Sequence, residues 1–271
     1  QWAVRNSCMM VFTAVAQRAV GTDKNDSAGA AVPTISEFFQ RFPALEPFLL
    51  SALSIATNSQ DGVHPTLYPL LLLIAKLRVA VLEESSISQT TVSKLVNLVD
   101  RCGTQKVQAV RVIAAKALRV LTPVSVGATA ASVRLQRVIQ QAQQKQQRRN
   151  TARLDLNSLH GHLVATRELL RSVDAYINAN EFTNAELVAH LRKQTSESVL
   201  QELRLAAEVL GEVNCAALQI PLLESVRFIR SILRTPAAEL ETLAAADALL
   251  VQVCRHVLPV IYAVGQNVTA N

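Results

Sequence analysis

Apolar residues recur along this chain at the three- and four-residue spacing of an α-helix, in one run after another. Half of the residues are apolar, most of these are Ala, Val or Leu, and only 4% are aromatic. Ala and Leu favour helices, and Val is tolerated in a helix where a packed face requires it. The two-residue alternation of a β-strand is hard to find. The sequence therefore predicts an all-α fold.

Glycine and proline mostly fall between the apolar runs, where helices start and stop. Gly21 ends the first run, Gly103 ends another, and a third stops before Pro123. Most connections between runs are short. These boundaries predict helices at residues 2–20, 35–41, 44–58, 66–82, 88–102, 105–121, 127–147, 155–178, 184–193, 196–210, 217–234 and 237–263.

Several predicted helices are apolar around most of their circumference, which a helix between neighbouring repeats requires. Leu70 to Ile74 is an unbroken apolar run, for example. A string of helices with short turns is either a bundle or a stacked solenoid. The apolar circumference favours an armadillo/HEAT-like α-solenoid of antiparallel helix pairs, although no repeat of fixed period is evident. Because Gln1 falls inside a helical pattern, we expect residues 1–271 to be a single solenoid segment excised from a larger protein.

Neither a membrane span nor a disulfide is expected. The apolar run from Leu67 to Leu82 is too short to cross a bilayer and contains Lys76 and Arg78. No N-terminal signal pattern precedes the first run. The four cysteines lie far apart without a CxxC pair, which predicts buried, reduced thiols.

Motifs that carry chemistry are also missing. His160 and His162 are two residues apart, so on a helix they point in different directions, and no carboxylate–His pattern accompanies them. The sequence contains no GxGxxG, P-loop, HExxH or GxSxG motif. We therefore expect no enzyme, no catalytic residue, no metal site, no bound cofactor and no small-molecule substrate.

Charge is distributed unevenly. The formal net charge is +6, yet residues 101–154 (the acid-free segment) contain no Asp or Glu. Eleven of the 27 basic residues lie in this segment, which leaves the rest of the chain with 16 basic against 21 acidic residues. The sequence thus predicts a mildly acidic protein with one basic region.

Helical spacing places many of these charges on the same sides of two helices. In helix 105–121, Lys116 and Arg119 fall opposite the apolar face and Arg111 falls on its flank. Residues 140–153 form a basic, Gln-rich stretch that is either an extension of helix 127–147 or a disordered loop. If the helix continues, a stripe about 120° wide holds Arg134, Arg137, Lys145, Arg148 and Arg149.

Three interpretations of this basic region remain open. Phosphate backbones are the usual partner of such a surface, and Arg offers them bidentate geometry. An acidic protein is a second partner, and a solvated outer face without a specific role is the third. On the first interpretation the nucleic-acid-binding candidates are Arg111, Lys116, Arg119, Arg134, Arg137, Lys145, Arg148 and Arg149.

Five strings between about residues 1 and 165, read together, resemble the thyroid-adenoma-associated protein family in the family's own order. The string around His64 is the most specific of them. The strings are Trp2-Ala-Val-Arg5-Asn6, Phe38-Phe39 with Pro43, His64-Pro65-Thr66-Leu67-Tyr68-Pro69, Val110-Arg111-Val112-Ile113-Ala114 and Asn157-Ser158-Leu159-His160-Gly161.

The resemblance implies a helical-repeat regulatory subunit in the cytoplasm. Members of this family pair with a separate methyltransferase that modifies a ribose 2′-hydroxyl in the tRNA anticodon loop. S-adenosylmethionine would belong to that enzyme, and tRNA and the enzyme would be the partners of this chain. An Arg-Arg-Ser-Ala-Gly string found in the family is absent here. If that string is needed, the segment alone would not support the enzyme.

Most residues of the family strings are expected to act in packing. His64 is placed to brace the turn before the helix at 66–82, and the two prolines beside it suit a first helical turn. Gly161 inside a helix suggests close approach of a neighbouring helix. The residues to which we assign this structural role are Trp2, Arg5, Asn6, His64, Pro65, Tyr68, Pro69, His160 and Gly161.

Together these inferences predict a non-catalytic scaffold that holds tRNA and a methyltransferase in fixed relative orientation. The alternative is a protein–protein interaction solenoid that does not touch RNA.

Overall fold

The computed structural model describes residues 2–20, 32–58, 63–82, 89–147, 154–211, 213, 215–234 and 243–255. Every regular element within these ranges is a helix, which confirms the all-α prediction for them. The chain divides into two compact units, Gln1–Pro123 (unit 1) and Val124–Asn271 (unit 2).

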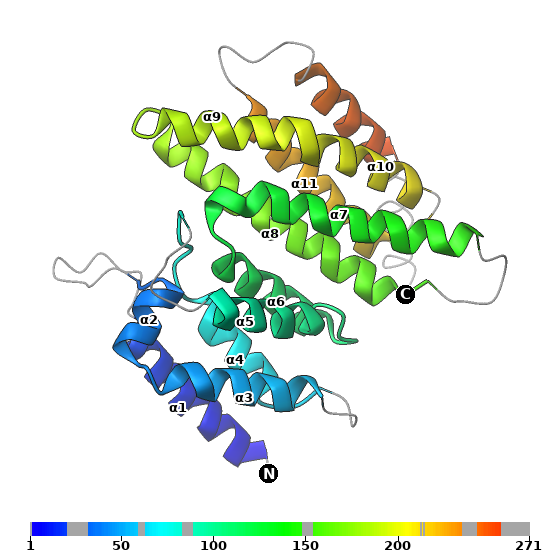
Figure 1. Cartoon of the computed structure of the whole chain (residues 1–271). Coiled ribbons are helices and arrows are strands. Elements are labelled where there is room, and N and C mark those ends of the chain that lie inside the picture. The colour runs from blue at the N-terminus through cyan, green and yellow to red at the C-terminus, as the bar shows by residue number, and fades with distance from the viewer. Residues whose placement is uncertain are drawn as a thin grey trace. The chain divides into compact units, whose positions relative to one another are not determined.

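In unit 1, helix α6 lies at the centre. It packs against α4 and α5, α3 packs against both of these, and α1 contacts α4. Nine of the 14 residues of α6 are buried, because helices cover two of its sides. The helices, which run from blue to green in Figure 1, are α1 (Trp2–Val20), α2 (Ile35–Arg41), α3 (Leu45–Thr57), α4 (Leu67–Ala75), α5 (Gln89–Cys102) and α6 (Gln108–Leu121).

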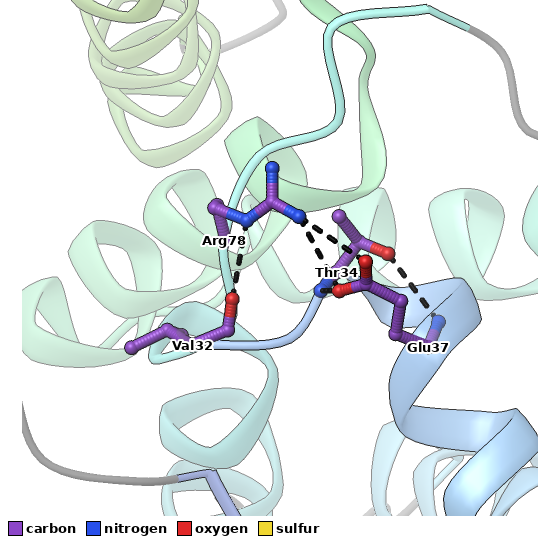
Figure 2. A network of polar contacts seen from close by, with 4 residues as sticks. All are labelled: Val32, Thr34, Glu37 and Arg78. Carbon is purple, nitrogen blue, oxygen red and sulfur yellow. Dashed lines mark hydrogen bonds and ion pairs between the residues drawn. The ribbon is translucent and has the colours of Figure 1, made fainter. Parts of the chain in front are cut away.

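A capping box starts α2. The Glu37 backbone N–H donates to Thr34 Oγ1 at 3.3 Å, and the Thr34 backbone N–H donates to Glu37 Oε2 at 2.7 Å. This reciprocal pair satisfies two backbone donors that a helix start otherwise leaves without partners. Figure 2 shows Arg78 reaching the same cap, where its Nη2 donates to both Glu37 oxygens at 3.3 Å.

The predicted helix at 66–82 is too long: α4 ends at Ala75. Arg78 explains the early end, because its backbone N–H donates to Pro33 O at 2.9 Å and its Nε donates to Val32 O at 3.1 Å. These bonds hold Arg78 beside the start of α2 (Figure 2), and residues 78–80 form no regular element. The apolar spacing continues to Leu82, so the local sequence does not signal the break.

We expect Glu37→Gln to cost unit 1 about 0.5 kcal/mol at pH 7, a small effect because the Glu37–Arg78 pair is half exposed. Gln preserves the cap but loses the charge. The hydrogen bond from the Thr34 backbone N–H lowers the pKa of Glu37; burial opposes this change, and Arg78 adds to it. The stability from the ionised carboxylate is therefore present above the unfolded-state pKa near ~4.3 and is lost as pH falls through the lowered value.

Hydrogen exchange of α2 between pH 3 and pH 7, with its intrinsic pH dependence corrected, measures this difference. The gap between wild type and Glu37→Gln should close at the acidic end. A gap of equal size at both ends would contradict the assignment. Glu208→Gln, at an exposed i,i+4 pair on unit 2, is the control and should leave α2 unchanged.

In unit 2, α7 and α8 lie side by side (Figure 1), and α11 covers another side of α8. Helix α7 also packs against α9, η1 and α10, so it too is covered on two sides. Residues 243–255 form a further helix. The named elements are α7 (Val124–Gln147), α8 (Leu156–Asn180), α9 (Ala185–Gln194), the π-helical turn η1 (Thr195–Val199), α10 (Leu200–Gly211) and α11 (Ala216–Leu233).

At Gly127, α7 comes close to α8. A Cβ atom built on Gly127 would lie 2.9 Å from Val173 Cγ2, closer than real side chains come. At this point the backbone of α7 therefore packs against a side chain of α8. The sequence predicts close approach at Gly161, which is buried in α8, but it does not single out Gly127.

The two helices predicted at 184–193 and 196–210 are joined without a loop. Between them the chain makes one π-helical turn, η1, in place of the expected break. Thr195 is fully buried there, and its Oγ1 donates to Leu191 O at 2.8 Å. This hydroxyl bonds to its own helix and so needs no solvent.

Candidate nucleic-acid interface

One narrow strip along helix α6 faces solvent. Val112, Lys116 and Arg119 are half-buried and recur at the spacing of one helix face, whereas most of the remaining residues are buried. Lys116 and Arg119 thus lie opposite the packed sides, as the helical wheel places them. The helix contains no acidic residue, so the strip is positively charged.

Two further cations near the α5–α6 turn are exposed. Lys106 lies in the turn itself, and Arg101 lies at the end of α5, where its Nη2 donates to Asn58 Oδ1 at 2.7 Å. Lys106 immediately precedes Val107, the N-cap residue of α6, and so adds an exposed positive charge before the start of that helix. Lys106 belongs to the acid-free segment but is not among the nucleic-acid-binding residues predicted from the sequence.

Arg111 is buried, whereas the helical wheel places it on the flank of the apolar face. Only 7% of the residue is exposed, and its Nη1 donates to the backbone oxygens of Gln105 at 2.7 Å and Lys106 at 2.8 Å. The wheel misplaced it because α6 has two packed sides, not one. The guanidinium therefore holds the turn that displays Lys106. Direct contact between Arg111 and RNA has no support from this geometry.

In unit 2, the basic stripe predicted along α7 is also only partly exposed. Arg137 is exposed, but Arg134 is only 7% exposed because α8 and the α9–α10 side together cover most of the helix. Residues 140–147 belong to α7, and the side chain of Lys145 is not described. Arg148 and Arg149 lie outside the described residues. The predicted stripe is thus reduced to Arg137 among the side chains that the structure places.

The described basic candidates fall into two groups. Lys106, Lys116 and Arg119 belong to unit 1, and Arg137 belongs to unit 2. The unit 1 group extends from the α5–α6 turn to Arg119 on α6, a span of about 20 Å at 1.5 Å per residue. Such a row of cations is suited to a polyanion because each one offsets a separate phosphate.

The most specific family string surrounds the start of α4. His64 Nδ1 lies 2.8 Å from Thr66 Oγ1 and accepts the Thr66 backbone N–H at 3.4 Å, so the ring braces the turn. Pro65 is exposed, while Pro69 is buried in the first turn of α4, where its missing N–H costs little. Tyr68 is 40% exposed.

The other family-string residues assigned to packing are either buried or have side chains that the structure does not describe. His160 and Gly161 are buried in α8 beside α7 and α11. Trp2, Arg5 and Asn6 belong to α1, but their side chains lie outside what the structure describes. The assignment of these residues to packing stays a prediction.

Two further titratable groups in the described ranges have shifted pKa values. Burial raises the pKa of the Cys102 thiol to about 12, and its Sγ donates to Leu98 O at 3.2 Å. Arg167 bridges Glu168 and Glu224 at 2.8 Å each, and these carboxylates outweigh the opposing effect of burial and raise its pKa. No three His, Cys, Asp or Glu residues among those described are grouped to hold a metal ion. None of the described helices is long and apolar enough to cross a membrane.

Comparison with known proteins gives matches that include this region. The family model for the C-terminal TPR repeats of Trm732 matches residues 5–169. The tRNA (32-2'-O)-methyltransferase regulator THADA of Homo sapiens is 35% identical over 125 residues, which are 43% of this chain and 6% of the relative. The regulator trm732 of Schizosaccharomyces pombe is 29% identical over 177 residues, 62% of this chain and 11% of the relative. No solved structure matches.

Proposed function

The chain belongs to the family whose model describes the C-terminal repeats of Trm732, and from this premise we propose that it is part of a non-catalytic regulatory subunit. The subunit would help a separate methyltransferase modify a ribose 2′-hydroxyl in the tRNA anticodon loop. The named relatives are regulators of a tRNA (32-2'-O)-methyltransferase, and the chain matches 6% to 11% of their length. One observation carries the proposal: the family match contains the whole acid-free segment.

In this proposal the chain supplies no chemical group to the reaction. It holds tRNA against the enzyme, because fixed orientation alone removes much of the entropic cost of bringing two reactants together. S-adenosylmethionine would be bound by the enzyme, in the cytoplasm. Stacking of the helices as antiparallel pairs in an armadillo/HEAT-like solenoid would give the subunit the extended surface that this task needs.

The contact with tRNA would be made by the basic residues that reach solvent, not by all those in the acid-free segment. Lys116 and Arg119 lie on the half-buried strip of α6, Lys106 is exposed just before that helix, and Arg137 is exposed on α7. Arg111 and Arg134 are left out because both are buried.

We expect the complete protein with Lys106, Lys116, Arg119 and Arg137 all changed to Gln to bind tRNA more weakly. Removing one phosphate contact should lower the slope of log affinity against log salt by about 0.7 to 0.9. Removing all four would lower the slope by about 3. Fluorescence anisotropy with labelled tRNA at several salt concentrations measures both the affinity and the slope.

A matched control removes four exposed arginines that lie outside the acid-free segment: Arg18, Arg171, Arg227 and Arg255. It changes the net charge equally, so it separates a local contact from a general field effect. Equal losses of affinity in the two variants, or no loss in the first, would remove the basic strip from the tRNA contact.

A second function is favoured by the burial of Arg111 and Arg134, which leaves fewer cations for a polyanion. In it the chain is a protein–protein interaction solenoid, and only the enzyme touches tRNA. A mobility-shift assay with the complete protein and tRNA, without the methyltransferase, distinguishes the two. A shifted band supports direct contact, and its absence supports the protein-only scaffold.

A further inference from the structure

The turn between α8 and α9 displays an aromatic side chain that its own fold does not use. Phe182 is 95% exposed, the highest value among the exposed large apolar residues of the described ranges. A phenyl ring in water forgoes the stabilisation that burial gives, about 25 cal/mol for each Å². Aromatic residues are the side chains that most often anchor protein interfaces.

Hydrogen bonds hold this turn in one shape. Asn180 Nδ2 donates to Tyr176 O at 2.9 Å, and the backbone N–H groups of Thr183 and Asn184 both donate to Asn180 O. Asn184 Nδ2 donates to Tyr176 Oη at 3.0 Å, while Asn184 Oδ1 caps α9 by accepting the Leu187 N–H at 3.4 Å. The polar groups beside Phe182 are thus occupied within the chain, and the phenyl ring is left facing outward.

An ion pair fixes the turn from the other side. Glu181 Oε1 lies 3.0 Å from Arg192 Nη2, and Arg192 Nε donates to Ile232 O at 3.0 Å at the end of α11. The residue before Phe182 is therefore tied to two further helices. A side chain presented by such a fixed turn loses little conformational freedom on binding, so less of the contact energy is spent on ordering it.

The surrounding charge indicates which kind of partner fits. Residues 172–191 contain no Lys or Arg, but they contain Asp174 and Glu186, besides Glu181, whose charge Arg192 offsets. Glu186 is exposed, four residues after Phe182 and in the first turn of α9. Negative charge disfavours a nucleic-acid backbone here and favours a protein whose apolar pocket has basic residues at its rim.

We propose that Phe182 and its turn are a docking anchor for the methyltransferase, which would take the phenyl ring into an apolar pocket bordered by Lys or Arg. An enzyme that acts on tRNA must itself carry a basic surface, which complements this acidic turn. The inference rests on the proposed function, because it takes the enzyme as the partner. In this arrangement the basic strip would bind tRNA, and the acidic, aromatic turn would bind the enzyme.

The test titrates the complete protein with the purified methyltransferase subunit and compares wild type with Phe182→Ser. Truncation of an aromatic anchor should raise Kd about ten-fold or more. Glu186→Lys should also raise Kd, and this effect should shrink at high salt. Leu205→Ser is the matched control, since Leu205 is another exposed apolar residue of unit 2, on α10, and it should leave Kd unchanged.

The affinity for tRNA is measured on the same variants and should not change. An unchanged Kd for the enzyme in Phe182→Ser would overturn this inference and leave the proposed function standing. Weaker tRNA binding with unchanged enzyme binding would also overturn it, since Phe182 would then stack on a base. If wild-type protein does not bind the enzyme at all, the proposed function fails and this inference fails with it.

Discussion

Arg111→Met is expected to lower the free energy of opening of the α5–α6 turn and the start of α6 by about 2 to 4 kcal/mol. The guanidinium is buried and donates to two backbone oxygens, those of Gln105 and Lys106. Met fills most of the space of the Arg stem but has no donor, so both oxygens are deprived of a charge-assisted hydrogen bond. Hydrogen exchange of amides in 103–112 of the complete protein measures this change.

Two further variants make the result specific. Lys116→Met removes a half-buried cation from the solvent-facing strip of α6 and should change exchange by less than about 0.5 kcal/mol. Arg111→Lys keeps the charge without the planar fork, so it should fall between wild type and Arg111→Met. If Arg111 instead binds phosphate directly, Arg111→Met would weaken tRNA binding without increasing exchange in the turn.

Gly127→Val is expected to destabilise the α7–α8 pair by about 3 kcal/mol, near the upper end for an overpacked site. Its Cβ would lie 2.9 Å from Val173 Cγ2, a methyl group on a buried β-branched side chain that cannot easily move aside. Gly127→Ala should destabilise less, because the better helix propensity of Ala returns about 1 kcal/mol. Hydrogen exchange of amides in α7 and α8 reports both effects.

The double variant Gly127→Ala with Val173→Ala tests whether this one contact is the cause. Shortening Val173 removes the methyl group that the new Cβ meets. In a chain that already carries Val173→Ala, Gly127→Ala should then stabilise the α7–α8 pair, whereas in the wild-type background it should destabilise the pair. A destabilisation of equal size in both backgrounds would show that Gly127 is needed for another reason.

Much of the fold follows from short-range signals in the sequence. Asp155 is the N-cap of α8 and accepts the backbone N–H groups of Asn157 and Ser158, both at 3.1 Å, so this start was predictable within one residue. The end of α5 at Cys102 is equally local, because Gly103 follows it. The end of α4 is not local, since it depends on Arg78 bonding to residues more than 40 positions away.

The candidate site was predictable in composition but not in detail. The absence of acidic residues from 101–154 is visible in the sequence, and so is the outward position of Lys116 and Arg119. A helical wheel assumes one packed face, whereas α6 and α7 are each covered on two sides. Arg111 and Arg134 are buried for that reason, which depends on the neighbours of each helix and not on its own spacing.

The π-helical turn η1 lets one extra residue fit between α9 and α10 without turning the helix that follows. A π-turn holds one residue more than an α-turn, so deleting a single residue from 195–199 would restore an ordinary α-helix. Because the wider turn absorbs the extra residue, α10 would keep nearly the same face toward the interior, and Leu203 and Leu210 would stay buried. A deletion inside α10 would instead turn every residue that follows by about 100°. Among relatives, single-residue deletions should therefore be tolerated in 195–199 far more readily than within α10.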